Sequence, residues 1–244
     1  MDEQEELIKI TADRIAAVES KIIDACKRAG RDRSEVTLIG VSKVFPASHA
    51  IAAVKAGLKD LGENRVQELV PKYDELHAAG LDPNWHLIGT LQKNKVKYIT
   101  GKTKLIHSVD SCDLLAEIDK RSKASNIVTD VLIQANVSGE ESKHGFAPDE
   151  LKAVLETSAS MENVRVRGLM TMAPIQQYEG QAKSVFAETK KIFDSLKTEC
   201  KDPSIWDCLS MGMSQDFEWA IEEGSTFVRI GTAIFGDRRY IDSH

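Results

Sequence analysis

The sequence predicts a single α/β domain: a (β/α)8 barrel of the TIM type with an additional N-terminal helix. Short apolar runs alternate with amphipathic stretches of about ten to twenty residues, and this alternation indicates a parallel sheet. Eight such runs occur in 244 residues, close to the length that one barrel requires. A doubly wound open sheet is the alternative, but no G-x-G-x-x-G motif follows the first run. No linker, repeat or low-complexity segment interrupts residues 1–244, so one domain is expected.

The first expected element is a helix over residues 4–29. Its apolar residues recur near the 3.6-residue period, and Gly30 follows as a stop signal. Asn64 followed by Gln67 resembles a capping box at the start of a later helix, and Gly224 is expected to end the last one. Strands are expected at residues 36–41, 57–61, 85–89, 105–109, 128–137, 164–170, 208–211 and 227–230. Helices are expected between them at residues 48–56, 64–78, 94–99, 111–122, 148–158, 176–197 and 215–223.

The composition excludes several classes of protein. Lys and Arg number 32 against 38 Asp and Glu, a net charge of −6, which argues against nucleic-acid and membrane-surface binding. No apolar stretch approaches the roughly 18 residues of a membrane-spanning helix, and residues 1–6 are acidic where a targeting peptide would be basic. A reduced, cytoplasmic, metal-free protein is expected, because no metal-binding or redox spacing relates the four cysteines Cys26, Cys112, Cys200 and Cys208.

Lys43 is the first candidate for chemistry, because functional groups of a barrel lie at the C-terminal ends of its strands. Side chains alternate along a strand, so Lys43 shares a face with Ile39 and Val41. If that face points into the barrel, the ammonium is partly desolvated, which lowers its pKa and suits it to form a Schiff base. The alternative is an ordinary lysine that extends from a strand end into solvent.

Arg229 is the second candidate. Val228 and Ile230 share one face of the last expected strand, and that aliphatic face suits packing against outer helices. Arg229 then points into the barrel, where a guanidinium stays charged and needs an acceptor. Either a structural ion pair or a bound ligand could provide that acceptor.

Two segments, residues 210–214 and 231–232, favour a phosphate ligand. Each combines small residues and hydroxyls with the start of an expected helical segment, whose free N–H groups attract anions. They follow the last two strands, where phosphate sites of barrels are commonly built. By contrast, His86 lies in an apolar strand and is expected to be a packed core residue. His144, in a polar loop flanked by glycine, is expected to be solvated.

Six stretches, in order along the chain, resemble the pyridoxal phosphate homeostasis protein family, whose barrel is similar to the N-terminal domain of alanine racemase. They are G-V-S-K at 40–43, G-E-N at 62–64, W-H-L-I-G-T-L-Q-K-N-K at 85–95, G-L-M-T-M at 168–172, L-S-M-G-M-S at 209–214 and V-R-I-G-T-A-I-F-G at 228–236. They are spread in order across essentially the whole chain, so this resemblance is far more specific than any single motif.

The resemblance implies that the chain binds pyridoxal 5′-phosphate (PLP). Lys43 would hold the cofactor as a Schiff base, and Arg229 would face the pyridine nitrogen. An arginine cannot protonate that nitrogen, because its pKa lies above about 12. The ring would therefore remain a poorer electron sink than a ring paired with a carboxylate.

The resemblance also implies contacts to the phosphate and to the cofactor ring. The phosphate would rest on Gly231, Thr232 and the 210–214 segment, where either Ser210 or Ser214 supplies the hydroxyl. Asn64 and Met211 would lie near the ring.

The function implied is that of a PLP-binding protein in intracellular vitamin B6 homeostasis, without established catalysis. Its partners would be PLP and PLP-dependent apoenzymes, the latter as transient acceptors. A monomer is expected, since the sequence contains no counterpart of the dimer-forming second domain of alanine racemases.

Two enzyme classes are the alternatives. An amino-acid racemase needs a base on each face of the substrate α-carbon, and Lys43 supplies only one. The opposing tyrosine of the racemases lies in the missing second domain, and the tyrosines of this chain lie away from the expected strand ends: Tyr73, Tyr98, Tyr178 and Tyr240. A Schiff-base aldolase for a phosphorylated sugar shares the lysine and the phosphate loops, but it has no need for Arg229.

Overall fold

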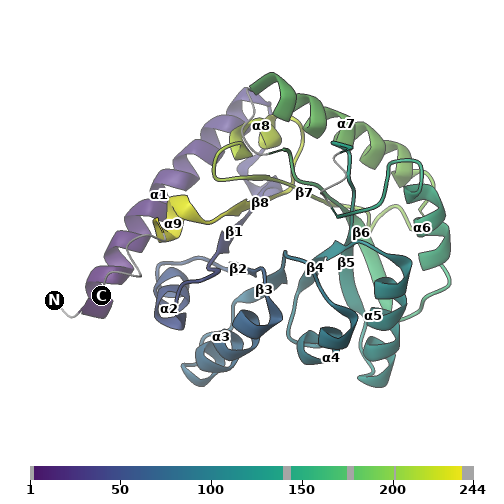
Figure 1. The fold of residues 1–244 in the computed structure, drawn as a ribbon. Coiled ribbons are helices and arrows are strands. Elements are labelled where there is room, and N and C mark those ends of the chain that lie inside the picture. Colours follow the sequence, from purple (N-terminus) through teal and green to yellow (C-terminus); the bar gives the residue numbers. More distant parts are fainter. Residues whose placement is uncertain (1–2, 140–143, 175–178, 201, 238–244) are drawn as a thin grey trace.

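The computed structural model describes residues 3–139, 144–174, 179–200 and 202–237. Eight parallel strands, hydrogen-bonded in sequence order, close into a barrel in which β8 pairs with β1 (Figure 1). The predicted fold class is therefore confirmed. The strands are β1 Thr37–Val41, β2 Asp60–Glu63, β3 Asn84–Leu87, β4 Leu105–Val109, β5 Thr129–Gln134, β6 Val164–Met170, β7 Cys208–Met213 and β8 Phe227–Ile230.

Helices surround the barrel and connect its strands (Figure 1). Within the described residues, no helix is both long enough and apolar enough to cross a membrane. The helices are α1 Glu3–Arg28, α2 Ala47–Lys55, α3 Val66–Ala78, α4 Val96–Ile99, α5 Cys112–Ala124, α6 Leu151–Ser158, α7 Glu179–Lys197, α8 Phe217–Glu222 and α9 Thr232–Phe235. Two short 3-10 helices, η1 Arg33–Glu35 and η2 Lys93–Lys95, precede β1 and α4.

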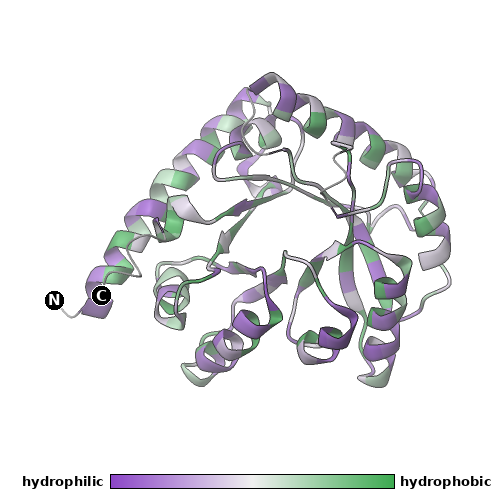
Figure 2. Cartoon of the chain, viewed as in Figure 1, coloured by the Kyte–Doolittle hydropathy of each residue, from purple (hydrophilic) through white to green (hydrophobic). Residues whose placement is uncertain are grey.

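The predicted N-terminal helix is α1, which packs against α2, α8 and α9 beside the strands that close the barrel. Its first turn is acidic and its last turn is basic, an arrangement that favours the helix dipole. The buried stripe includes Val18, Ile22 and Ala25. Beyond the end of the helix, Gly30 adopts a positive φ of 65°, as the predicted stop signal requires. The amphipathic pattern recurs around the barrel, where apolar and polar residues alternate along the helices (Figure 2).

Two apolar clusters hold the barrel together. The larger one fills the space between the strands and the surrounding helices, as expected for strands that are covered on their outer face. The smaller one lies among β4, β5, β6 and β7 and consists of Leu105, Leu132, Met170 and Cys208, with Phe227 of β8 packed against it. The strands also bury polar side chains, among them those of His86, His107, Ser210 and Arg229.

The predicted capping box at Asn64 is wrong. Helix α3 begins at Val66, its N-cap residue is Arg65, and no side chain caps it. Asn64 remains in the link after β2, where the backbone of Gly89 packs closely against it. A Cβ at position 89 would lie 2.4 Å from the Asn64 carbonyl oxygen. This contact between two strand ends cannot be inferred from the spacing of Asn64 and Gln67.

Two further expectations concern glycines next to helices. The strand expected at residues 57–61 begins only at Asp60, because Gly57 ends α2 with a φ of 99°. The amide groups of Gly57 and Leu58 donate back into that helix, to Val54 and Ala53. Gly224 has a φ of 96° directly after the C-cap of α8, so its predicted role is confirmed.

Candidate functional site

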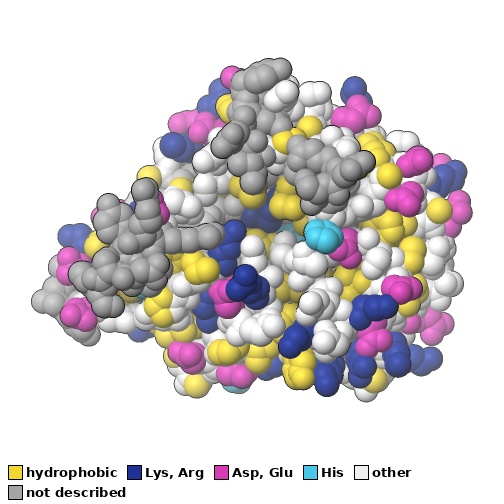
Figure 3. All heavy atoms as spheres, viewed as in Figure 1, with side chains coloured by type: hydrophobic (Ala, Val, Ile, Leu, Met, Phe, Trp, Pro, Cys, Tyr) yellow, Lys and Arg dark blue, Asp and Glu magenta, His cyan; other side chains and the backbone are white. Residues whose placement is uncertain are grey.

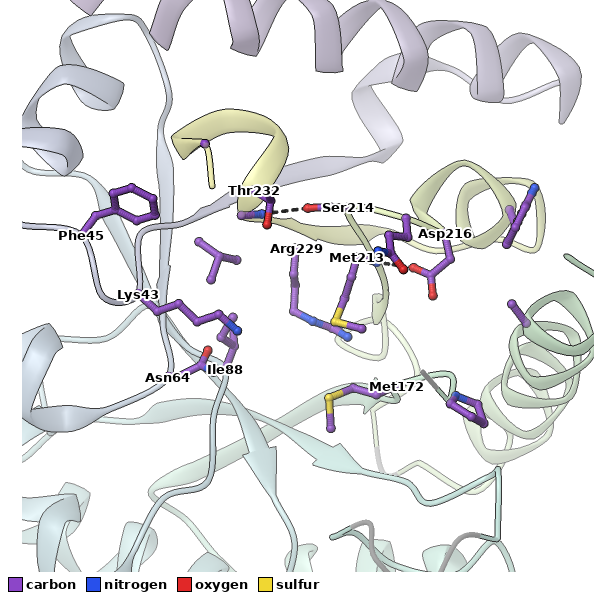
Figure 4. Close-up of a pocket in the computed structure, with 17 residues that line it drawn as sticks. Lys43, Phe45, Asn64, Ile88, Met172, Met213, Ser214, Asp216, Arg229 and Thr232 are labelled. Carbon is purple, nitrogen blue, oxygen red and sulfur yellow. Dashed lines mark hydrogen bonds between the residues drawn. The ribbon is translucent and has the colours of Figure 1, made fainter. Parts of the chain in front are cut away.

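A cavity of about 310 Å³ opens at the C-terminal ends of the strands. The face of the molecule seen in Figure 3 carries intermingled acidic and basic side chains. Basic, acidic, hydroxyl-bearing and apolar side chains together line the cavity, which is seen in close-up in Figure 4. Its lining includes Val41, Lys43, Phe45, Asn64, Ile88, Met172, Met213, Ser214, Asp216, Trp219, Arg229, Gly231 and Thr232.

Lys43 lies two residues beyond the end of β1, in a turn, and its side chain extends into the cavity (Figure 4). The residue is half-buried. Val41 also lines the cavity, so the alternation predicted from the sequence continues past the strand end. Asn64 and Ile88, from the ends of β2 and β3, lie beside the lysine amine (Figure 4).

A buried ion pair behind the cavity holds the turn that carries Lys43. Lys72 of α3 donates from Nζ to the carbonyl oxygen of Ser42 (2.8 Å) and to Glu63 Oε1 (2.6 Å). The Ser42 hydroxyl donates to the same carboxylate oxygen (2.5 Å). Burial raises the pKa of Glu63, against the opposing effect of the neighbouring ammonium. Val44, the residue after Lys43, has a φ of 65°, so the turn is held in a conformation that branched residues rarely adopt.

Arg229 points into the barrel from β8 and is 4% exposed. Its Nη1 donates to Ser210 Oγ (2.5 Å), and its Nη2 donates to the carbonyl oxygen of Thr171 (2.9 Å). Burial lowers the pKa of this guanidinium to about 10, so it remains charged at neutral pH. No ion pair joins it to a carboxylate of a described residue. Its hydrogen-bond partners are an uncharged hydroxyl and a carbonyl, not the carboxylate that a structural ion pair would require.

Hydroxyl and backbone groups gather at one end of the cavity. Ser214 accepts a hydrogen bond from the amide of Gly231 (3.2 Å), which links the segment after β7 to the one after β8. Thr232, the first residue of α9, extends into the same region (Figure 4). Asp216 lies farther along and accepts from the Met213 amide (2.6 Å). Burial raises the pKa of the Asp216 carboxyl.

The structure brings together at the cavity most of the residues that the sequence singled out: Lys43, Asn64, Ser214, Arg229, Gly231 and Thr232. Ser210 and Met211 are fully buried in β7 and do not belong to the lining. Ser210 bonds to Arg229 and His107, and Met211 packs in the larger apolar cluster. A cofactor contact by Ser210 or Met211 stays a prediction. In the structure, both side chains contact other residues of the protein interior instead of lining the cavity.

Several lining residues were not anticipated. Ile88 and Met172 follow β3 and β6, so their position at strand ends was an available signal. Asp216 was assigned to a helix over 215–223, but α8 begins only at Phe217. His86 is buried as predicted, with an exposure of 1%, and His144 is exposed as predicted.

Comparisons with known proteins agree on the family. Residues 16–239 match the family model described as alanine racemase, N-terminal domain. A pyridoxal phosphate homeostasis protein of Aquifex aeolicus is 46% identical over 228 residues, covering 93% of this chain and 98% of that protein. One of Pseudomonas aeruginosa is 41% identical over 229 residues, covering 94% and 96% of the two chains.

A solved structure adds a direct comparison of the fold. PipY of Synechococcus elongatus, solved with PLP bound, is 33% identical and superposes with a TM-score of 0.79 over 93% of this chain and 100% of that one. The coverage is nearly complete in both directions, and the matched region includes every strand of the barrel. The chain therefore belongs to the pyridoxal phosphate homeostasis protein family, whose barrel is that of the alanine racemase N-terminal domain.

Proposed function

We propose that this chain binds PLP in the cavity, holds it as a Schiff base on Lys43, and serves in intracellular vitamin B6 homeostasis without turning over a substrate. The observation that carries the proposal is the convergence of a lysine amine, a buried guanidinium and a cluster of hydroxyls on one cavity. The names of the relatives and the PLP-bound state of PipY support it.

The residues present fit the chemical groups of PLP. The aldehyde needs a primary amine, which Lys43 supplies from the turn after β1. The pyridine nitrogen needs a donor, which the guanidinium of Arg229 can supply. The ring needs apolar neighbours, and Ile88, Met172 and Met213 line the cavity between these polar groups. The cavity volume of about 310 Å³ is also within the range of small-molecule sites.

We assign the phosphate to the end of the cavity formed by Ser214, Gly231 and Thr232. Ser214 has an accessible hydroxyl there, whereas the hydroxyl of Ser210 is fully buried between Arg229 and His107. Of the two serines left open by the sequence, Ser214 is thus the better candidate. The residues would bind the anion through hydroxyl donors and the close approach that a glycine backbone permits.

Two observations favour binding over catalysis. Arg229 would keep the ring nitrogen unprotonated, because a guanidinium retains its proton, and this weakens the ring as an electron sink. The two described tyrosines do not line the cavity: Tyr73 lies on α3 beside His77, and Tyr98 is 48% exposed on α4. Among the described residues, then, no tyrosine is placed as a second base opposite Lys43. PLP-dependent apoenzymes are the acceptors that we infer for the bound cofactor.

The test compares wild-type protein with Lys43→Ala after both are incubated with PLP. Wild type should gain the visible absorption band of a Schiff base, and borohydride should abolish the band and leave the cofactor on the peptide that contains Lys43. Lys43→Ala should show neither effect. Lys120→Ala, an exposed lysine on α5 away from the cavity, is the control and should behave as wild type. Covalent trapping on another lysine of Lys43→Ala would overturn the assignment.

A further inference from the structure

A line of hydrogen-bonded side chains runs through the barrel from Arg229 to Asp60. Arg229 donates to Ser210 Oγ (2.5 Å), and Ser210 Oγ lies 2.9 Å from His107 Nδ1. His107 Nε2 lies 3.0 Å from His86 Nδ1, and His86 Nε2 lies 3.0 Å from Asp60 Oδ1. The five residues come from β8, β7, β4, β3 and β2, so this line of hydrogen bonds crosses the interior of the barrel. None of its middle members lines the cavity.

The surroundings isolate the middle of this line from water. Ser210, His86 and His107 are each at most 1% exposed. The two imidazoles meet edge to face with ring centroids 5.1 Å apart, and Phe227 packs against both, at 5.9 and 5.8 Å. In such a setting a hydrogen bond is strengthened, and an unsatisfied polar group is costly. The hydrogens of the line must therefore be arranged so that each group finds its partner.

The two ends of the line determine that arrangement. The carboxylate of Asp60 only accepts, so His86 carries a hydrogen on Nε2, and with a single ring hydrogen its Nδ1 accepts. His107 must then donate from Nε2 and accept at Nδ1, and the Ser210 hydroxyl supplies that hydrogen. Ser210 is left with a lone pair toward Arg229, which only donates. Full burial lowers the pKa of His107 well below its usual value, so the neutral form that this arrangement requires is the stable one.

We infer that Ser210, His107, His86 and Asp60 are positioning residues for Arg229, and that they fix its guanidinium toward the ring nitrogen of bound PLP. Every hydrogen in the line points away from Arg229, so each bond presents its negative end to the guanidinium. This alignment favours the charged form that burial opposes. The carbonyl of Thr171 holds the second terminal nitrogen, so the guanidinium is fixed at two points. The cofactor side of this inference rests on the proposed function, whereas the hydrogen-bond line does not.

The first arm of the test measures the line itself, in protein without cofactor. Nitrogen NMR of 15N-histidine-labelled protein reports which ring nitrogen carries hydrogen. We expect Nε2 to carry the hydrogen and Nδ1 to accept in both His86 and His107, with His77, exposed on α3, as the reference. A hydrogen on Nδ1 of either ring would refute the one-directional line. This arm needs no variant, so it remains decisive if a variant fails to fold.

The second arm measures the effect on Arg229 by comparing PLP with its carbocyclic analogue, in which CH replaces the ring nitrogen. Wild type should bind PLP more tightly by roughly tenfold to a hundredfold, the value of one hydrogen bond to a charged group. Ser210→Ala and His107→Leu should reduce this preference to within about threefold, because the guanidinium loses its fixed orientation. Ser225→Ala removes a neighbouring buried hydroxyl that bonds only to backbone carbonyls, and it should retain the preference.

The outcomes separate the two proposals. If wild type binds neither compound, the proposed function is wrong, and the NMR arm still decides the arrangement of the line. If wild type binds both compounds equally, Arg229 does not contact the ring nitrogen, and the positioning role is overturned. If Ser210→Ala keeps the full preference for PLP, the line does not position Arg229.

Discussion

At the scale of single residues, the cavity depends on two cations that are held in different ways. Lys43 lies half-buried on a turn and reaches open space, which suits an amine that must meet an incoming aldehyde. Arg229 is nearly fully buried and bonded at both terminal nitrogens, which suits a group that recognises one atom of a ligand. A lysine at position 229 would replace a planar guanidinium, held at both terminal nitrogens, by a flexible amine that cannot be oriented in this way.

Thr232→Ala tests the phosphate end of the cavity. The substitution removes one hydroxyl donor to a charged group, and such a bond contributes about 1.5–3 kcal/mol, which is roughly tenfold to a hundredfold in Kd. We expect weaker PLP retention in equilibrium dialysis, with an unchanged Schiff-base absorption band. Thr157→Ala, an exposed threonine on α6, serves as the control. Equal affinity in Thr232→Ala and wild type would place the phosphate elsewhere.

His107 predicts a dependence of stability on pH. Burial holds its pKa well below the value of about 6.5 expected in the unfolded chain. Between those two values the unfolded state binds more protons, so stability is complete above about pH 6.5 and falls as the pH drops below it, by up to about 1.4 kcal/mol per pH unit for this group. Urea unfolding between about pH 5 and pH 8 should show a shallower acid slope for His107→Gln than for wild type. His77→Gln is the matched control, and identical slopes in all three proteins would contradict the prediction.

At the scale of elements, the site is supported by contacts between the strand ends and the helices behind them. The turn after β1 is held from outside the barrel by Lys72 of α3, and β2 contributes Glu63 to the same cluster. The segment after β7 is joined to the one after β8 by Ser214 and Gly231. The cavity walls are thus fixed to each other as well as to their own strands.

Lys72→Met tests the buried pair. It leaves Glu63 as an uncompensated buried carboxylate, which should destabilise the protein by about 3–5 kcal/mol in urea unfolding. The double variant Glu63→Leu/Lys72→Met should recover much of that loss, because the unpaired charge is removed. Lys93→Met, which breaks the exposed pair with Asp113, should cost less than about 1 kcal/mol. A loss in Lys72→Met no larger than that of the control would mean that the pair does not support the turn.

The sequence was most informative for strands in which apolar and polar residues alternate, because the alternation shows which side chains share a face. Arg229 could be placed inside the barrel because Val228 and Ile230 occupy the other face of β8. His107 could not be singled out, because every residue of β4 is buried and a strand buried on both faces loses its alternating pattern.

The choice between Ser210 and Ser214 illustrates a second limit. The two residues are separated by an even number of positions, so regular alternation would place both side chains on the same face of the strand. The pairing of β7 with β8, however, shifts register between Ser210 and Met213. Within that stretch Gly212 adopts a φ of 94°, and its backbone packs so closely on α8 that a Cβ would lie 2.6 Å from that of Ala220. This bulge sends Ser210 into the interior and Ser214 to the cavity.

At the scale of the whole molecule, the cavity is built from one barrel, and its described lining holds one lysine and no tyrosine. A general acid or base contributes roughly a hundredfold to ten-thousandfold to a reaction, so the lack of the racemase-type tyrosine among the described lining residues is a large deficit for racemisation. Under the proposed function, the guanidinium of Arg229 facing the ring nitrogen would add to it.

We therefore expect no appreciable racemase, decarboxylase or transaminase turnover by the PLP-loaded protein. Incubation with a panel of amino acids in deuterated water, followed by NMR of the α-proton, checks this, because exchange reports carbanion formation whatever the product. Lys43→Ala controls for background exchange by free PLP. Rapid exchange in wild type that disappears in Lys43→Ala would restore the racemase alternative.

The pairing of β8 with β1 has a consequence for how the site comes into being. Ile39 lies opposite Arg229 in this pairing, so the segment that carries the lysine meets the segment that carries the guanidinium only when the last strand joins the first. This is a contact of very high sequence separation, and such contacts close late and slowly in folding. A chain whose last strand has not yet joined the first thus lacks the paired arrangement of Lys43 and Arg229, and under the proposed function it could not hold PLP through both residues. Under the proposed function, PLP that binds only the closed barrel would stabilise only the closed barrel, so the supply of the vitamin and the persistence of the folded protein would be thermodynamically linked.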